Sequence, residues 1–103
     1  MKANGNRFKV IFHLRVVTND SNIWAVYARI TINKKRIELS TRQSIKKESW
    51  DENNGMAYPI NKECKQLNDF LDQLKGSYLE AFREMLFLKM HINTENFKKI
   101  FFC

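Results

Sequence analysis

Basic, aromatic and hydroxyl side chains recur at alternate positions in three short stretches of residues 1–50. They are Lys9, His13, Arg15, Tyr27, Arg29, Thr31, Asn33, Arg36 and Ser40, and Lys34 and Lys35 lie beside them. Alternation places such side chains on one face of a β-sheet. A sheet fits the major groove of B-DNA, where Arg contacts guanine while Lys, Thr and Ser hold phosphates. The pattern therefore favours DNA binding, with an ordinary solvated sheet face as the alternative.

The charge distribution supports a polyanionic partner for the first half of the chain. Residues 1–50 carry 11 Lys and Arg against 3 Asp and Glu, whereas residues 51–103 carry 7 against 8. The whole net charge of +7 therefore comes from the first half. Such an asymmetry indicates a nucleic-acid partner, although charge that serves solubility alone remains an alternative.

Signals for catalysis, metals and cofactors are weak. The chain has only 3 Gly and no phosphate-binding loop, and its two histidines, His13 and His91, lack a metal-ligand spacing. Asp69 and Asp72 share one side of a predicted helix, as solvated pairs often do. Cys64 and Cys103 suggest neither a disulfide framework nor a zinc site, which favours a reducing cytoplasm. We therefore expect no enzyme activity, no cofactor and no metal site.

Alternating apolar residues predict three strands, at residues 8–17, 24–33 and 36–41. The apolar positions that should face a core are Phe8, Val10, Phe12, Leu14, Val16, Val26, Ala28, Ile30, Ile32, Ile37 and Leu39. Turn-forming residues separate the first two strands, and Asn33-Lys34-Lys35 separates the second and third. Two consecutive hairpins predict an antiparallel three-stranded meander.

The second half predicts helices after an irregular segment at 42–59, in which Trp50 should plug the core. Apolar residues then recur every three or four positions at Cys64, Leu67, Leu71, Leu74, Tyr78, Phe82 and Met85. This spacing predicts a long helix over about residues 61–90, with Asn61 as its N-cap. A short second helix is expected at 94–102. The fold class is therefore α+β, one domain over residues 1–103, with the meander packed against the long helix.

The C-terminal segment carries many apolar residues for the end of a small domain. They are Phe82, Leu86, Phe87, Leu88, Met90, Ile92, Phe97, Ile100, Phe101 and Phe102. Some should pack on the sheet, and the rest should form an exposed patch. We expect residues 82–102 to contact a following domain or a second copy of the chain.

The ordered motifs resemble a known family. They are Phe12-His13-Leu14-Arg15, Val26-Tyr27-Ala28-Arg29-Ile30-Thr31, the run from Asn33 to Thr41, Trp50-Asp51, and Ile60-Asn61 before Leu67, Leu74 and Tyr78. Together they resemble the N-terminal arm-type DNA-binding domain of tyrosine recombinases (phage integrases), as carried by mobile elements of Bacteroidetes such as conjugative transposons. The resemblance covers about residues 8–100. It implies a sheet that enters the major groove of arm-type sites, with Arg15, Tyr27, Arg29, Thr31 and Arg36 as DNA contacts.

Three positions depart from the family pattern. Lys34 and Arg42 stand where the family often has Gly, and Lys47 stands where Pro is common. The first two departures concern turn geometry and the third concerns the following loop. None removes a basic residue.

The resemblance implies an accessory function. The catalytic domain of such a recombinase would lie downstream of Cys103, so Tyr27, Tyr58 and Tyr78 are not expected to be its nucleophile. The expected partner is double-stranded DNA at the bacterial nucleoid, in the cytoplasm. No apolar run or N-terminal segment predicts a membrane span or signal peptide.

Two other functions fit the same sequence. A three-stranded sheet with a flanking helix is also the outline of double-stranded RNA-binding domains, although these bind through helices and loops. Alternatively, the apolar C-terminal helix could make the chain a protein-interaction module with an incidental basic sheet.

Overall fold

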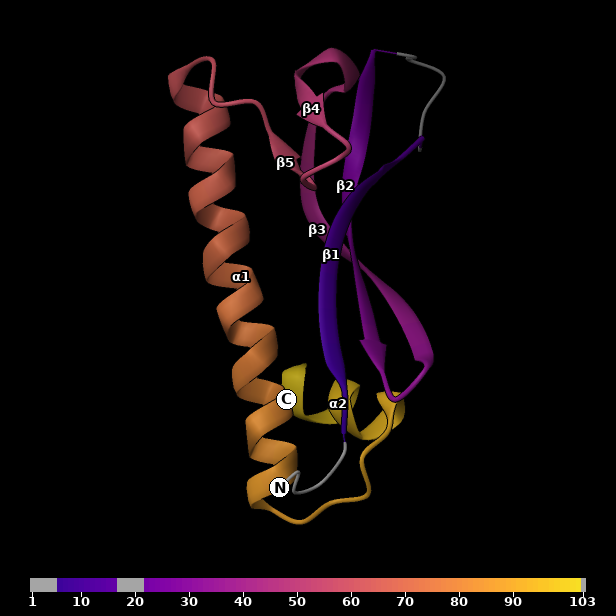
Figure 1. Cartoon of the computed structure of the whole chain (residues 1–103). Helices are drawn as coiled ribbons and strands as arrows, with labels where there is room; N and C mark the ends of the chain where they lie inside the picture. Colours follow the sequence, from indigo (N-terminus) through magenta and orange to yellow (C-terminus); the bar gives the residue numbers. More distant parts are fainter. Residues whose placement is uncertain (1–5, 17–21, 103) are drawn as a thin grey trace.

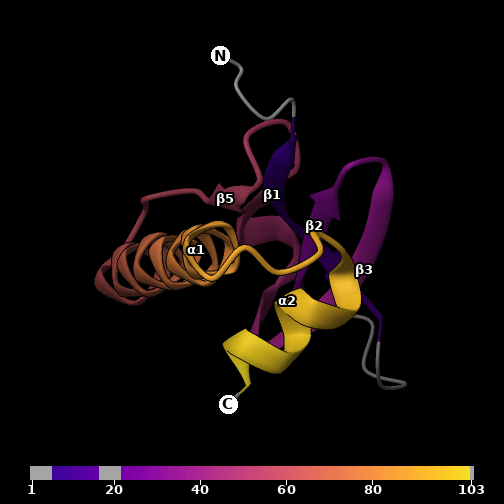
Figure 2. The same cartoon turned by 90° about the horizontal axis from the view of Figure 1, so that it is seen from below.

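The computed structural model describes residues 6–16 and 22–102, and it has the predicted α+β architecture (Figure 1). The elements in chain order are β1 (Phe8–Arg15), β2 (Ile23–Ile32), β3 (Lys35–Lys46), the 3-10 turn η2 (Lys47–Ser49), β4 (Trp50–Asp51), β5 (Met56–Ala57), α1 (Lys62–Phe87) and α2 (Thr94–Phe101). Strands β1, β2 and β3 form the antiparallel meander, and β4 and β5 form a small separate hairpin. Figure 2 shows both helices on the same side of the three-stranded sheet.

Alternation correctly predicted the two faces of the sheet. Val26, Ala28, Ile30 and Ile32 of β2 are buried, and Phe12 of β1 is buried beside them. Directly opposed residues of antiparallel strands share a face, so the pairing of Phe12 with Ala28 continues this inner face across the sheet. Strand β1 ends at Arg15 and not at the predicted Val17, and Val16, which was predicted to face the core, is 54% exposed. Val17 and the predicted start of the turn at Thr18 lie outside the described residues.

The turn between β2 and β3 has a left-handed backbone. Asn33 has φ 50° and Lys34 has φ 78°, the signs that a two-residue type I′ hairpin requires. The side chain of Asn33 also binds the segment before β1. Its Oδ1 accepts a hydrogen bond from the Arg7 N–H at 2.8 Å, and its Nδ2 donates to Asn6 Oδ1 at 2.8 Å. The Asn33 side chain therefore fixes the turn to the segment before β1.

Strand β3 continues past the predicted end at Thr41, so the predicted irregular segment 42–59 starts too early. The register jumps from Tyr27 opposite Ser40 to Val26 opposite Gln43, which leaves Thr41 and Arg42 as extra residues in a bulge. The buried Thr41 hydroxyl donates to the Val26 carbonyl at 2.7 Å and accepts from the Gln43 N–H at 3.2 Å. Arg42 takes φ 63°. The bulge breaks the two-residue alternation, which hides the strand's continuation from a pattern search.

The rest of the predicted irregular segment also has order, in the β4–β5 hairpin. Trp50 is buried, as predicted for a core plug. Gly55 has φ +63°, and a Cβ there would lie 3.1 Å from the carbonyl oxygen of Phe12. The side-chain amide of Asn68 on α1 completes the hairpin, because it accepts from the Ala57 N–H and donates to the Ala57 carbonyl, each at 2.9 Å.

Helix α1 begins as predicted and ends earlier than predicted. Asn61 Oδ1 caps it by accepting from the Cys64 N–H at 2.8 Å. The helix stops at Phe87 instead of about residue 90, because Lys89 takes φ 57°. The Lys89 N–H then bonds the Leu86 carbonyl, and the Met90 N–H bonds the Met85 carbonyl, both at 3.1 Å. This is a Schellman motif without its usual glycine.

Helix α2 closes one end of the core. Asn93 Oδ1 caps it by accepting from the Asn96 N–H at 2.7 Å. Phe97 is buried, and the Phe8 ring lies 4.6 Å from Phe82 and 5.8 Å from Phe97 between centroids. Tyr78 is buried in the same cluster, and this burial raises the pKa of its phenol to about 12. Seven of the ten apolar residues of the C-terminal segment join the core, as expected for part of that set.

Candidate nucleic-acid interface

The outer face of the sheet is the one turned away from both helices (Figure 2). Four cross-strand rows form it, running from β1 to β3. They are Lys9–Thr31–Arg36, Ile11–Arg29–Glu38, His13–Tyr27–Ser40 and Arg15–Ala25–Ser44. Its charged residues, apart from His13, are four cations and Glu38. No described element covers this face.

The structure brings eight of the eleven predicted site residues together on the outer face. They are Lys9, His13, Arg15, Tyr27, Arg29, Thr31, Arg36 and Ser40. The other three lie elsewhere. The amide of Asn33 is bound to Arg7 and Asn6, and Lys34 lies in the turn. Lys35 pairs with the buried Ile32, so its side chain starts from the inner side of the sheet.

Arg15 stacks on an aromatic ring of the neighbouring strand. Its Cζ lies 4.6 Å from the centroid of the Tyr27 ring. A guanidinium over an aromatic face is attracted by the ring's electrons and loses part of its side-chain freedom. The stacked pair therefore presents Arg15 in a defined position at one end of the outer face.

Glu38 links the three strands at the centre of the outer face. Its Oε2 accepts a hydrogen bond from Arg29 Nε at 2.9 Å, and its Oε1 lies 2.7 Å from His13 Nε2. Partial desolvation raises the pKa of the Glu38 carboxyl, but the Arg29 hydrogen bond and the charge and hydrogen bond of His13 outweigh it, so the net pKa is lowered. The carboxylate therefore stays ionised between two basic partners.

Among the residues of the outer-face rows that the predicted set left out are Ile11, Glu38 and Ser44. Glu38 carries a negative charge, so it did not belong to a set defined by basic, aromatic and hydroxyl side chains. Ile11 is 38% exposed opposite Arg29, and an apolar residue on a polar face gave no signal. Ser44 lies beyond the bulge, where the alternation could not be followed.

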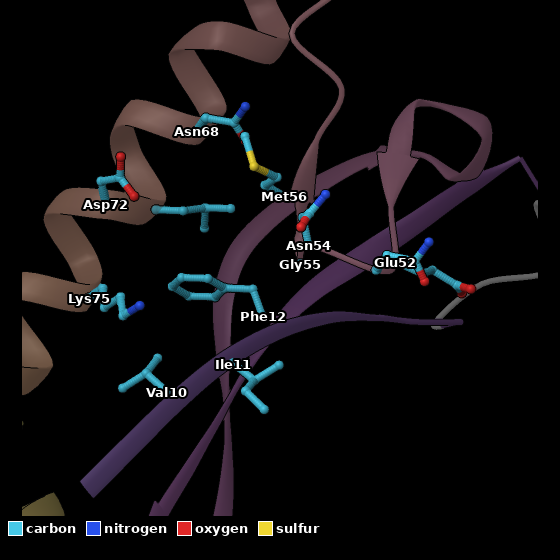
Figure 3. A pocket seen from close by; sticks show the side chains of 12 residues that line it. Val10, Ile11, Phe12, Glu52, Asn54, Gly55, Met56, Asn68, Asp72 and Lys75 are labelled. Atoms are coloured by element: carbon cyan, nitrogen blue, oxygen red, sulfur yellow. The ribbon is translucent and has the colours of Figure 1, made fainter.

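A separate hollow of about 320 Å³ lies between β1, the β4–β5 loop and α1. Figure 3 shows Asp72 and Lys75 on α1 facing Val10 and Phe12 on β1 across it. No His, Cys, Ser or Tyr of the described residues lines the hollow, and its charged residues are Glu52, Asp72 and Lys75.

Within residues 6–16 and 22–102, no three His, Cys, Asp or Glu side chains lie close enough to hold a metal ion. Neither helix there has the length and apolar character needed to cross a bilayer. Cys64 is buried as a free thiol, and Cys103 lies outside the described part.

Comparison with known families gives one match. The family described as "Arm DNA-binding domain" matches residues 12–98, which is most of the chain. This confirms the resemblance to the arm-type domains of tyrosine recombinases. No curated protein and no solved structure gives a significant match.

Proposed function

We propose that this chain, which belongs to the Arm DNA-binding domain family, binds duplex DNA sequence-specifically through the outer face of its sheet. Arm domains bind DNA for an integrase and are not themselves catalytic. The observation that carries the proposal is the arrangement of the outer face. Four cations, an aromatic ring and hydroxyl groups lie on one uncovered surface, while both helices pack on the other.

The outer face separates into two kinds of contact. Arg15 and Arg29 are held by neighbouring side chains, so they suit base edges in the major groove, where a bidentate Arg–guanine pair contributes about 1–3 kcal/mol of discrimination. Lys9 and Arg36 share the row nearest the turn, with Thr31 between them. This row and the rim cation Lys34 suit phosphates, which fix the position of the protein on the duplex.

Helix α1 offers no comparable surface for duplex RNA. It carries four Lys and Arg against five Asp and Glu, so its net charge is −1. Double-stranded RNA-binding domains contact their ligand through helices and loops, which would have to be basic. The charge of α1 therefore favours DNA on the sheet. Competition between duplex DNA and duplex RNA for the protein tests this preference.

A pair of double variants tests the proposed face. Arg15→Ala with Arg29→Ala removes two outer-face cations, and Lys75→Ala with Arg83→Ala removes two exposed cations of α1. Binding to a pool of random-sequence and selected duplexes should fall by more than about tenfold for the first variant and little for the second. Equal losses, or none for the sheet variant, would refute the assignment. Circular dichroism and urea unfolding check that both variants fold.

We also propose that the apolar end of the domain contacts a second copy of the chain. Phe87 and Leu88 are neighbours at the end of α1 and are 83% and 52% exposed, and Phe102 after α2 is 64% exposed. Such exposure of large apolar side chains is typical of an interaction surface. Sedimentation equilibrium should show dimers that Phe87→Ser weakens. A monomer at all concentrations would exclude self-association and favour a following recombinase domain as the partner of this end.

In an integrase, the proposed role is accessory. The domain would hold distal arm sites on a mobile element while a separate catalytic domain acts at the recombination core. A chromosomal DNA partner would place this activity at the nucleoid, in the cytoplasm.

A further inference from the structure

The outer face contains one feature that a simple DNA-binding surface would exclude. Glu38 lies in the middle of it, in the row Ile11–Arg29–Glu38, and is its only acidic residue within the described strands. A carboxylate facing DNA repels phosphates, so at that place it should weaken binding. We therefore looked to its contacts for an effect on DNA binding that offsets this repulsion.

Glu38 makes two contacts that span the sheet. Arg29 on β2 donates its Nε–H to Oε2 at 2.9 Å, and His13 Nε2 on β1 lies 2.7 Å from Oε1. Both carboxylate oxygens are thereby occupied by groups from the other two strands. The side chain of Glu38 is 32% exposed and that of Arg29 is 36% exposed, so the network lies at the surface and not in the core.

The direction of the Arg29 contact determines which donors remain. A guanidinium has five N–H groups, and the Nε–H is the one on the side of the guanidinium nearest the aliphatic chain. Because Glu38 takes the Nε–H, the four N–H groups on the two Nη atoms stay available. Two parallel N–H groups are what a guanine requires at its O6 and N7 acceptors.

The neighbours of Arg29 support the same orientation. Ile11 is directly opposite Arg29 on β1 and only partly exposed, so it offers an apolar surface for the methylene groups of the arginine. Glu38 is opposite on β3 and holds the charged end. An arginine fixed in this way has less side-chain freedom to lose when it binds a base.

From this geometry, and resting on the proposed function of the outer face, we infer that Glu38 is a positioning residue that orients Arg29 to read a guanine. Glu38 acts through Arg29 and need not touch DNA. It lowers the general affinity of the face for phosphates and raises its preference for one base.

Two other roles of Glu38 would fit the same position. Glu38 could only repel phosphates, as a brake on binding to all sequences. Alternatively, it could itself accept a hydrogen bond from the N4 amino group of a cytosine. The three roles give different results when Glu38 and Arg29 are changed singly and together.

The experiment selects duplexes from a pool with a randomised central segment and sequences the bound fraction. The variants are Glu38→Ala, Glu38→Gln, Arg29→Ala and the double variant Arg29→Ala with Glu38→Ala. Glu48→Ala is the matched control, because Glu48 is an exposed acid on η2, outside the outer face. Affinity for an unselected duplex is measured for each protein at one fixed salt concentration.

If Glu38 positions Arg29, its loss should reduce base preference without reducing affinity. General damage to the fold would reduce both. Glu38→Ala should bind the unselected duplex at least as tightly as the native protein, yet lose roughly tenfold of its preference for guanine at one position. Arg29→Ala should lose preference at the same position, and the double variant should lose no more than Arg29→Ala alone. Glu38→Gln should lie between the native protein and Glu38→Ala, and Glu48→Ala should keep the native preference.

Each other result overturns the inference. If Glu38→Ala tightens binding to every duplex and keeps the native preference, Glu38 is only a brake. If it changes preference at a position that Arg29→Ala leaves intact, Glu38 reads a base itself. If the native protein selects no sequence, there is nothing for Glu38 to position. In these three cases the sheet can still be the DNA face, which fails only if Arg15→Ala with Arg29→Ala loses no more affinity than Lys75→Ala with Arg83→Ala.

Discussion

Lys34 has a backbone conformation that a side chain makes costly. It has φ 78° in the turn between β2 and β3, after Asn33 at φ 50°. An L-residue in the left-handed region costs about 1–2 kcal/mol because its Cβ crowds the following carbonyl oxygen. Glycine has no Cβ and adopts this region freely. Lys34→Gly should therefore stabilise the domain.

The expected gain in the free energy of unfolding of Lys34→Gly is the difference between two effects. Relief of the left-handed strain contributes about 1–2 kcal/mol, and the extra freedom of glycine in the unfolded chain removes about 0.5–1 kcal/mol. The net gain is then about 0.75 kcal/mol, which for a domain of this size raises Tm by about 3–6 °C. Lys34 is exposed, so no packing is lost with its side chain.

The control is the next residue along the chain. Lys35 is also an exposed lysine at this turn, but it lies in β3 and has no left-handed backbone. Lys35→Gly removes the same charge and should destabilise by about 0.5–1 kcal/mol, as glycine in a strand does. Urea unfolding of the three proteins measures the order. If Lys34→Gly unfolds at the same urea concentration as the native protein or earlier, with an unchanged slope, the strain argument is wrong.

Further substitutions test the core, the bulge in β3 and helix α1. The folded pKa of Tyr78 is about 12 and its ordinary value is 10.0, so the native domain loses stability as pH rises above 10. At about pH 11 the loss is about 1 kcal/mol. Urea unfolding at about pH 7 and about pH 11 should show this loss for the native protein and not for Tyr78→Phe. Thr41→Val leaves the Val26 carbonyl and the Gln43 N–H without the hydroxyl and should cost about 1–3 kcal/mol by the same measurement. Phe97→Ala should cost about 3–5 kcal/mol because Phe97 is fully buried, whereas Phe102→Ala, at 64% exposure, should change thermal stability little. Gly76→Ala should raise stability by about 1 kcal/mol, since an added Cβ meets nothing within 4 Å, and an unchanged Tm would contradict this.

Periodic signals made the sheet faces and α1 predictable from the sequence. Strands β1 and β2 have one apolar and one polar face, so period-two alternation placed Phe12, Ala28 and Arg29 correctly. The buried series of α1 repeats every three or four residues and its N-cap is a polar residue before that series. These elements satisfy local and tertiary preferences at once.

The predicted ends of β3 and α1 were wrong because one or two residues break the regular spacing of side chains there. The bulge at Thr41 and Arg42 shifts the phase of β3, and nothing in their residue types signals two extra positions. Lys89 ends α1 in a left-handed conformation without glycine, so the apolar pattern ran on past the true end. The bulge and the helix end both depend on hydrogen bonds that form only in the folded chain.

The candidate site was predictable as a set but not in its details. Alternation selected a polar face, but it could not determine that the Asn33 amide binds Asn6 and the Arg7 N–H. The contacts of Glu38 with Arg29 and His13 depend on how β1 and β3 register against β2, which the sequence of one strand does not contain.

The packing of Phe8 against Phe97 has a consequence for the synthesis of the chain. The two rings lie 5.8 Å apart, although 89 positions separate the residues in the chain. At about 5–20 residues per second, a ribosome would add Phe97 about 4–18 s after Phe8, whereas hairpins form in microseconds. The end of the inner face that α2 covers must therefore stay exposed until then, and during that interval the ribosome-bound chain is a substrate for chaperones and proteases.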